Sequence, residues 1–257
     1  TVILAIFLLP TCSQNPASEI ESSRQAILAR LKQEAEQGES TAQIQLGLIY
    51  LNGEDVPQDY AESVRWFRAA AEQGDQRAQV NLGYMYRDGL GIPQDLAKSV
   101  RWYRMAAEQG HASAQNALGV MYQSGYGVSQ DIRESVKWYR MAAEQGHADA
   151  QIQLGLLNAN GEGVSQSYTE SAKWFRLAAN QGDASGQLNL GRLYHSGNGV
   201  SQNYVQAHMW YKLAASGSRG ELREYASQSR DLVASKMTSE EIYEAQSLAA
   251  KWRPKRK

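Results

Sequence analysis

Histidine and cysteine are the residues of this chain whose chemistry would be most specific. His111 and His147 stand 36 residues apart, at positions where other parts of the chain carry Asp75 and Asp183. The remaining two of the four histidines have no cysteine or second histidine at a ligand spacing. A zinc site needs three or four such ligands brought together. We therefore expect no metal and no cofactor, and we interpret His111 and His147 as residues at helix starts.

Short Gly-x-Gly segments are the second candidate for chemistry, because glycine-rich loops can hold phosphate. A dinucleotide fingerprint also needs a preceding strand and a third glycine that opens a helix, and neither is indicated here. No Gly-x-Ser-x-Gly elbow, Cys-His pairing or repeated acidic dyad is present either, so we predict no catalytic residues and no enzyme. The segments are Gly89-Leu90-Gly91, Gly125-Tyr126-Gly127, Gly161-Glu162-Gly163 and Gly197-Asn198-Gly199.

The elements that must position these residues repeat with a period of 36 residues. A fixed period in this range indicates a repeat array, in which each unit buries its apolar face against its neighbours. The tryptophans lie on the periodic face and are predicted to be core residues. Leu-Gly pairs begin at Leu46, Leu82, Leu118, Leu154 and Leu190, and the tryptophans are Trp66, Trp102, Trp138, Trp174 and Trp210.

Each unit is predicted to be two helices joined by a turn. In the first helix Ala, Leu and Tyr follow one another at i, i+4 and i+8, which forms an apolar stripe. The glycine after the leucine costs about 1 kcal/mol in a helix, so we expect it to allow close packing. Asp55, where later units carry the second turn glycine, is expected at positive φ. The second helix is expected to start after the N-cap residues Asp59, Asp95, Asp131, Ser167 and Asn203.

The chain divides into four parts on these patterns. Residues 1–18 are interpreted as a truncated export signal and linker, and 19–37 as an N-terminal capping helix. Residues 38–217 hold five repeats, and 218–257 are expected to form C-terminal capping helices and a frayed basic tail. Thr238 and Glu241 form a capping-box pattern within the last part.

The first residues favour export. An apolar run from Val2 to Leu9 is too short to span a bilayer, which needs about 20 residues, but fits the apolar region of a signal peptide. Leu9-Pro10-Thr11-Cys12 resembles a bacterial lipobox, with Cys12 as the candidate lipidation site. We expect an exported, periplasmic or envelope-associated protein, with membrane contact through Cys12 or the basic tail. An unstructured apolar tail is the alternative.

Composition narrows the class of partner. Formal net charge is −1, so no global field attracts nucleic acid, and we expect none as a partner. Hydrophobic residues make up 42% of the chain, enough for a core. Cys12 is the only cysteine, which excludes an internal disulfide.

The repeated unit, Ala-x-x-x-Leu-Gly-x-x-Tyr-x-x-Gly-x-Gly-Val followed by Trp-x-x-x-Ala-Ala-x-x-Gly, closely resembles the Sel1-like repeat, a relative of the tetratricopeptide repeat. The resemblance covers residues 38–217, with departures at Asp55, Asn158, Ser167 and Gly186. It implies an all-α fold, a right-handed α/α solenoid whose first helices line a concave face. It also implies a non-enzymatic scaffold or adaptor that binds a protein or peptide, and bacterial members are often exported.

Comparison among the units separates scaffold from recognition. The repeated Gln43, Gln79, Gln115, Gln151 and Gln187 are interpreted as structural, whereas positions that vary on the first helices are free to recognise a partner. The predicted partner-binding residues are Leu48, Leu51, Asn52, Tyr84, Arg87, Asp88, Val120, Gln123, Leu156, Asn160, Arg192, His195 and Ser196.

The second helices carry a row of basic residues, each of the first three followed by Glu four positions on. We interpret this row as a solvated outer face with i,i+4 ion pairs, or alternatively as a stripe for an acidic partner. The row is Arg68, Arg104, Arg140, Arg176 and Lys212. For the whole chain, the alternatives to an interaction scaffold are an envelope-associated hydrolase on a repeat fold and a lipid-anchored surface module.

Overall fold

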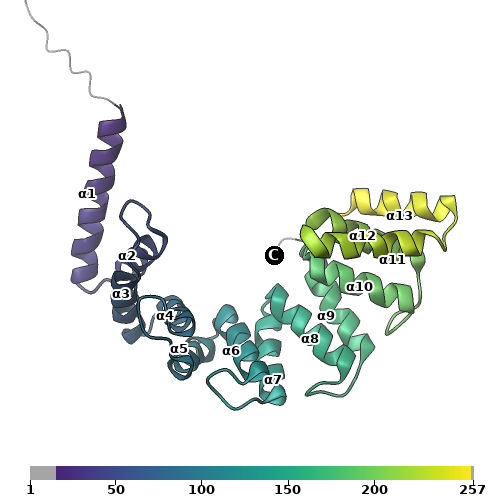
Figure 1. The fold of residues 1–257 in the computed structure, drawn as a ribbon, viewed down its shortest axis with the longest axis horizontal. Helices are drawn as coiled ribbons and strands as arrows, with labels where there is room; N and C mark the ends of the chain where they lie inside the picture. The colour runs from purple at the N-terminus through teal and green to yellow at the C-terminus, as the bar shows by residue number, and fades with distance from the viewer. Residues whose placement is uncertain (1–15, 256–257) are drawn as a thin grey trace, which may run out of the picture.

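A computed structural model describes residues 16–255, and side chains from residue 22. The described part contains thirteen helices and no strand, stacked along a curved path with α1 at one end and α12 and α13 at the other (Figure 1). The helices are α1 Pro16–Glu36, α2 Ser40–Asn52, α3 Tyr60–Glu72, α4 Gln76–Asp88, α5 Leu96–Glu108, α6 Ala112–Ser124, α7 Ile132–Glu144, α8 Ala148–Asn160, α9 Tyr168–Asn180, α10 Ala184–Ser196, α11 Tyr204–Gly217, α12 Gly220–Ala234 and α13 Ser239–Lys251. The predicted all-α solenoid is confirmed.

Each second helix begins where its cap residue predicts. The side chains of Asp59, Asp95, Asp131, Ser167 and Asn203 all accept hydrogen bonds from backbone N–H groups of the first helical turn. Asp75 and Asp183 do the same for first helices. His111 and His147 stand at the N-cap position as expected, but their side chains make no capping bond.

The turn between the two helices depends on its second glycine. Gly91 has φ +66°, and a Cβ there would lie 2.3 Å from the carbonyl carbon of Tyr60 at the start of the preceding second helix. Asp55, at the same place in the first repeat, adopts φ 61°, as predicted. The turn therefore packs on the neighbouring repeat and fixes the spacing between units.

The centre of each repeat is the aromatic residue that follows the tryptophan. These rings are buried, and they pack against the helical glycine of the first helix: a Cβ on Gly119 would lie 2.5 Å from Cδ1 of Tyr139. The expected packing role of this glycine is confirmed. The buried rings belong to Phe67, Tyr103, Tyr139, Phe175 and Tyr211.

The tryptophans are less buried than predicted. Trp66 and Trp210 are core residues, whereas Trp102, Trp138 and Trp174 are half-buried. The following aromatic takes the interior position because the helical glycine makes room for its ring. The three half-buried indoles pack against the buried core clusters without being enclosed by them.

A ladder of buried glutamines links the layers. Gln115 donates from Nε2 to the Ala107 carbonyl of the preceding second helix and accepts from Nε2 of Gln145 in its own repeat. The same pair of bonds recurs at Gln43, Gln79 and Gln151. At Gln187 the donor is lost, because Gly217 replaces the second glutamine, and Oε1 has no partner. The structural interpretation of these glutamines is correct.

The C-terminal cap covers the last repeat. Thr238 and Glu241 form the predicted capping box at the start of α13. Trp252 packs edge-on against Trp210, and the Lys255 N–H donates to the Asn180 carbonyl at 2.7 Å. The segment after α13 is therefore held against the solenoid as far as Lys255, where a frayed tail was expected.

The basic row on the second helices is paired differently from the prediction. Arg68, Arg104 and Arg176 donate to the hydroxyls of Tyr86, Tyr122 and Tyr194 of the next first helix. Arg140 lacks this partner because Asn158 replaces the tyrosine and bonds instead to the Leu154 carbonyl. The expected ion pairs with Glu four residues on do not form among the described residues.

Candidate partner-binding groove

The first helices lie on the inner side of the curve. Helices α6 and α8, and α8 and α10, contact each other directly across the stack. In Figure 1, α4 and α6 lie nearer the centre of the curve than α5 and α7. The inner side of an arc is the shorter one, so it is where consecutive helices meet. The inner face is therefore built from the helices that carry the predicted binding rows.

Most of the predicted residues are accessible on this face. Leu48 and Val120 are 39% and 40% exposed, which is high for aliphatic side chains. Leu51 differs, since it packs against the core of the first two repeats. Asn52 donates to the Glu54 carboxylate at 3.0 Å and lies at the rim of its turn.

Two pockets open on the inner face, two repeats apart. The N-terminal pocket, of about 560 Å³, is lined by Tyr84, Arg87 and Val120 among others. The positive charge of Arg87 is neutralised by a carboxylate of the same chain. Arg87 donates from Nε and Nη2 to both carboxylate oxygens of Asp88, at 2.7 and 2.9 Å, and its guanidinium lies 4.9 Å from the centre of the Tyr84 ring. Arg87 holds the pKa of Asp88 below its usual value.

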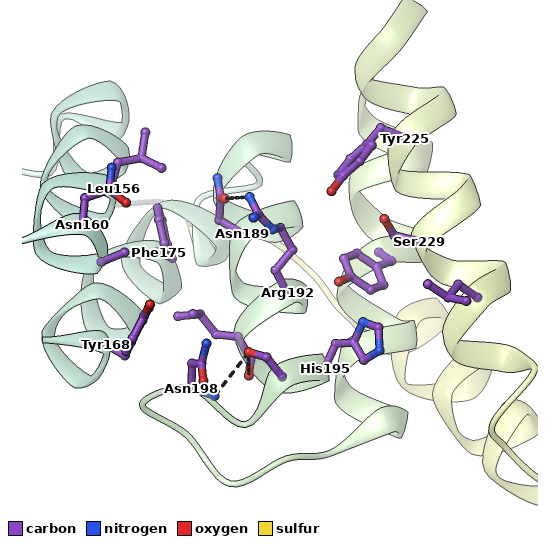
Figure 2. Close-up of a pocket in the computed structure, with 15 residues that line it drawn as sticks. Leu156, Asn160, Tyr168, Phe175, Asn189, Arg192, His195, Asn198, Tyr225 and Ser229 are labelled. Carbon is purple, nitrogen blue, oxygen red and sulfur yellow. Dashed lines mark hydrogen bonds between the residues drawn. The ribbon is translucent and has the colours of Figure 1, made fainter.

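The C-terminal pocket, of about 440 Å³, brings together five predicted residues (Figure 2). They come from α8 and α10 and are Leu156, Asn160, Arg192, His195 and Ser196. The lining residues that were not predicted include Tyr168 from α9, Asn189 from α10, and Tyr225, Ser229 and Leu232 from α12. A comparison of first helices could not find those on α9 and α12, because they belong to other elements.

Arg192 supplies the positive charge of the C-terminal pocket, and Lys236 lies beside it next to His195. The Arg192 guanidinium makes one hydrogen bond, of 3.4 Å, to Oδ1 of Asn189. Nζ of Lys236 lies 3.3 Å from Nε2 of His195. Burial, and secondarily Lys236, lower the pKa of His195, so its ring is neutral at pH 7. No carboxylate is among the described residues that line this pocket.

A buried tyrosine is among the residues that line each pocket. Tyr103 lines the N-terminal pocket and Tyr211 the C-terminal one. Burial raises the pKa of each hydroxyl to about 12, so both remain protonated donors at neutral pH. Between the pockets the equivalent Tyr139 donates to Oε1 of Gln123, at 2.8 Å, so this predicted residue is occupied within the chain.

The described residues contain no cluster of three or more potential metal ligands, and no helix among them is long and apolar enough to cross a membrane. Cys12 and the apolar run before it lie outside the described residues. The groove presents exposed aliphatic and aromatic side chains, amides and arginines.

Antiparallel helix pairs stacked in register, with a variable inner face, define the chain as an α/α solenoid of the kind that binds other proteins. The Sel1 repeat family matches residues 40–75, 76–111, 112–147, 148–183 and 184–218. The chain belongs to the Sel1 repeat family. Repeats of this family commonly mediate protein–protein interaction. No curated protein matches the chain.

Two solved structures are similar over most of the chain. One is c5321, a protective antigen present in uropathogenic Escherichia coli strains, with 39% identity and a TM-score of 0.78 over 86% of this chain. The present chain covers 47% of that protein, about half its length. The other is a Sel1 repeat protein from Oxalobacter formigenes, with 30% identity, a TM-score of 0.76, and coverage of 90% of this chain and 95% of that one.

Proposed function

We propose that this chain is a non-enzymatic scaffold that binds a protein or peptide partner along its inner face. The observation that carries the proposal is that buried and exposed positions of the first helices differ in how much they vary between repeats. Buried positions such as the helical glycine and the glutamine ladder repeat from unit to unit, whereas exposed positions on the same helices differ. Tyr84, Arg87, Arg192 and His195 are the principal anchors, since Tyr and Arg are enriched among residues that dominate binding energy.

We also propose that the protein is exported and acts in the periplasm or at the envelope. The apolar run before Cys12 supports this proposal, as does the similarity to a protein described as a protective antigen. Cys12 is the proposed lipid attachment site.

Site-specific photocrosslinking in fractionated cells tests both proposals. A photoreactive amino acid replaces Val120 on the inner face or, as a matched control, Met105 on the outer face. The two side chains are similarly exposed, at 40% and 44%. We expect Val120 to crosslink one stoichiometric protein in the envelope fraction, with yield reduced by alanine at Tyr84 and Arg87 or at Arg192 and His195. Crosslinks from Met105 alone would contradict the inner-face proposal, and a cytosolic chain would contradict export.

A further inference from the structure

The residues equivalent to Arg87 and Tyr103 are hydrogen-bonded differently in the second, third and fifth repeats. The buried tyrosine of the second repeat, Tyr103, shares its pocket with Arg87, whose charge Asp88 neutralises. One repeat on, Gln123 stands in the position of Arg87 and accepts from the Tyr139 hydroxyl. Arg87 in the second repeat and Tyr139 in the third therefore already have partners within the chain.

The fifth repeat leaves its donors open. His195 takes the position of Gln123 and lies beside Lys236 of the cap, 3.3 Å from its ammonium. The Tyr211 hydroxyl has no hydrogen-bond partner among the described residues. Arg192 takes the position of Tyr84, adds a guanidinium held by a single long bond to Asn189, and has no acidic neighbour in the pocket lining.

The walls beside these donors are apolar and exposed. Tyr168 of α9 is 36% exposed, and Tyr225 and Leu232 of α12 are 49% and 55% exposed. Figure 2 shows Tyr168 and Tyr225 on opposite sides of the pocket, with Arg192 between them. A pocket of about 440 Å³ is within the range of specific ligand sites, and an unneutralised arginine beside aromatic walls suits an anion flanked by apolar groups.

We propose that the pocket between α8, α10 and α12 binds a carboxylate side chain of an acidic segment of the partner protein, with an apolar residue next to it in sequence. The Arg192 guanidinium and the Tyr211 hydroxyl donate to the carboxylate, Lys236 adds positive charge at the rim, and Tyr168, Tyr225 and Leu232 contact the apolar neighbour. This inference rests on the proposed function and names the chemical class of the partner.

Selection from a library of random peptides on the intact chain supplies the probe. We expect enriched peptides to carry Asp or Glu beside an aromatic or aliphatic residue. A fluorescent copy of the most enriched peptide is then titrated by anisotropy. We expect Arg192→Gln to weaken its binding by roughly tenfold or more, and Tyr211→Phe to weaken it by a smaller factor. Phe67 and Phe175 occupy the position of Tyr211 in other repeats, so the phenylalanine fits the fold.

Arg140→Gln is the matched control, because it removes one arginine charge from the outer face. It should leave the affinity unchanged, and a peptide with Asn or Gln in place of its acidic residues should bind weakly to every variant. Enrichment of peptides without acidic residues, unchanged affinity of Arg192→Gln, or complete displacement of the peptide by millimolar inorganic phosphate would each overturn the proposal. Inner-face crosslinks that survive Arg192→Gln would retain the scaffold function and reject this pocket assignment.

Discussion

At the scale of single residues, the repeats reveal which positions tolerate a polar group. His208 is buried in α11, with only 3% of its surface exposed, and its Nδ1 has no hydrogen-bond partner. The first three repeats carry Val64, Val100 and Val136 at this position, and the fourth carries Ala172. A buried polar atom without a partner costs roughly 1–3 kcal/mol. The fifth repeat is therefore weaker at this point than its neighbours.

Replacing His208 with valine should raise the free energy of unfolding by roughly 1 kcal/mol at pH 7, because it removes the unpaired polar atom. The variant should also be less sensitive to acid. Burial, then the charges of Arg230 and Lys212, lower the pKa of His208 below its ordinary value of 6.5. The unfolded chain therefore binds the proton more tightly than the folded one, and stability falls as pH drops through 6.5.

Urea unfolding at a series of pH values from 7.5 downward measures both effects. Burial also lowers the pKa of His111 and His195, so a smaller pH dependence should remain in His208→Val. If the variant lost stability on acidification as steeply as the parent chain, the assignment to His208 would be wrong.

At the scale of elements, one glycine sets the distance between the two helices of each repeat. Ser135 of α7 donates to the Gly119 carbonyl of α6 at 2.7 Å, and the Tyr139 ring fills the space where a Cβ would lie. Helix propensity alone would favour alanine over glycine by about 1 kcal/mol. Packing against the Tyr139 ring favours glycine over alanine instead, and this effect outweighs helix propensity at the site.

Gly119→Ala should therefore destabilise the protein by about 1–3 kcal/mol, the usual cost of overpacking a core. Gly217→Ala is the control, because the nearest atom to its added Cβ is 4.0 Å away, on Ala184. That variant should be as stable as the parent or slightly more so. The measurement is denaturant unfolding followed by far-UV circular dichroism. Equal effects of the two substitutions would show that helix propensity, and not packing on Tyr139, governs the site.

At the scale of the whole molecule, most contacts run between successive helices, and the others given for the described residues join helices two apart in the order, such as α6 and α8 or α11 and α13. A stack of this kind has stability that is approximately a sum over repeats and their interfaces. The C-terminal cap shields the last repeat, since Val233 is fully buried against the cluster around Tyr211 and Ala226. A defect in the cap should therefore act locally.

Val233→Asp should increase amide hydrogen exchange in α11, α12 and α13 while leaving α2 to α5 protected, because a buried charge opens the end of the stack alone. Tyr243→Asp is the control, since Tyr243 is 76% exposed and the charge stays in water. Exchange resolved by peptide and mass spectrometry measures the pattern. A uniform rise along the chain would show that the solenoid unfolds as one cooperative unit.

The sequence by itself determined the repeats, the helix starts and the class of fold. All three features depend on contacts between neighbouring repeats. Because those contacts recur every 36 residues, the same residue pattern appears in the sequence once for each repeat. Comparison of the units also located the accessible inner rows, including Arg192 and His195.

Only the tertiary structure decided which members of those rows form sites. Asp88 neutralises Arg87, whereas Arg192 faces Tyr225 and Leu232 of the cap, which has no counterpart in the repeat pattern. It also decided that Phe67, Tyr103 and their equivalents, and not every tryptophan, fill the core. The physical reason is that a pocket depends on the pairing of side chains from three or more helices, and pairings of that kind do not recur with the repeat.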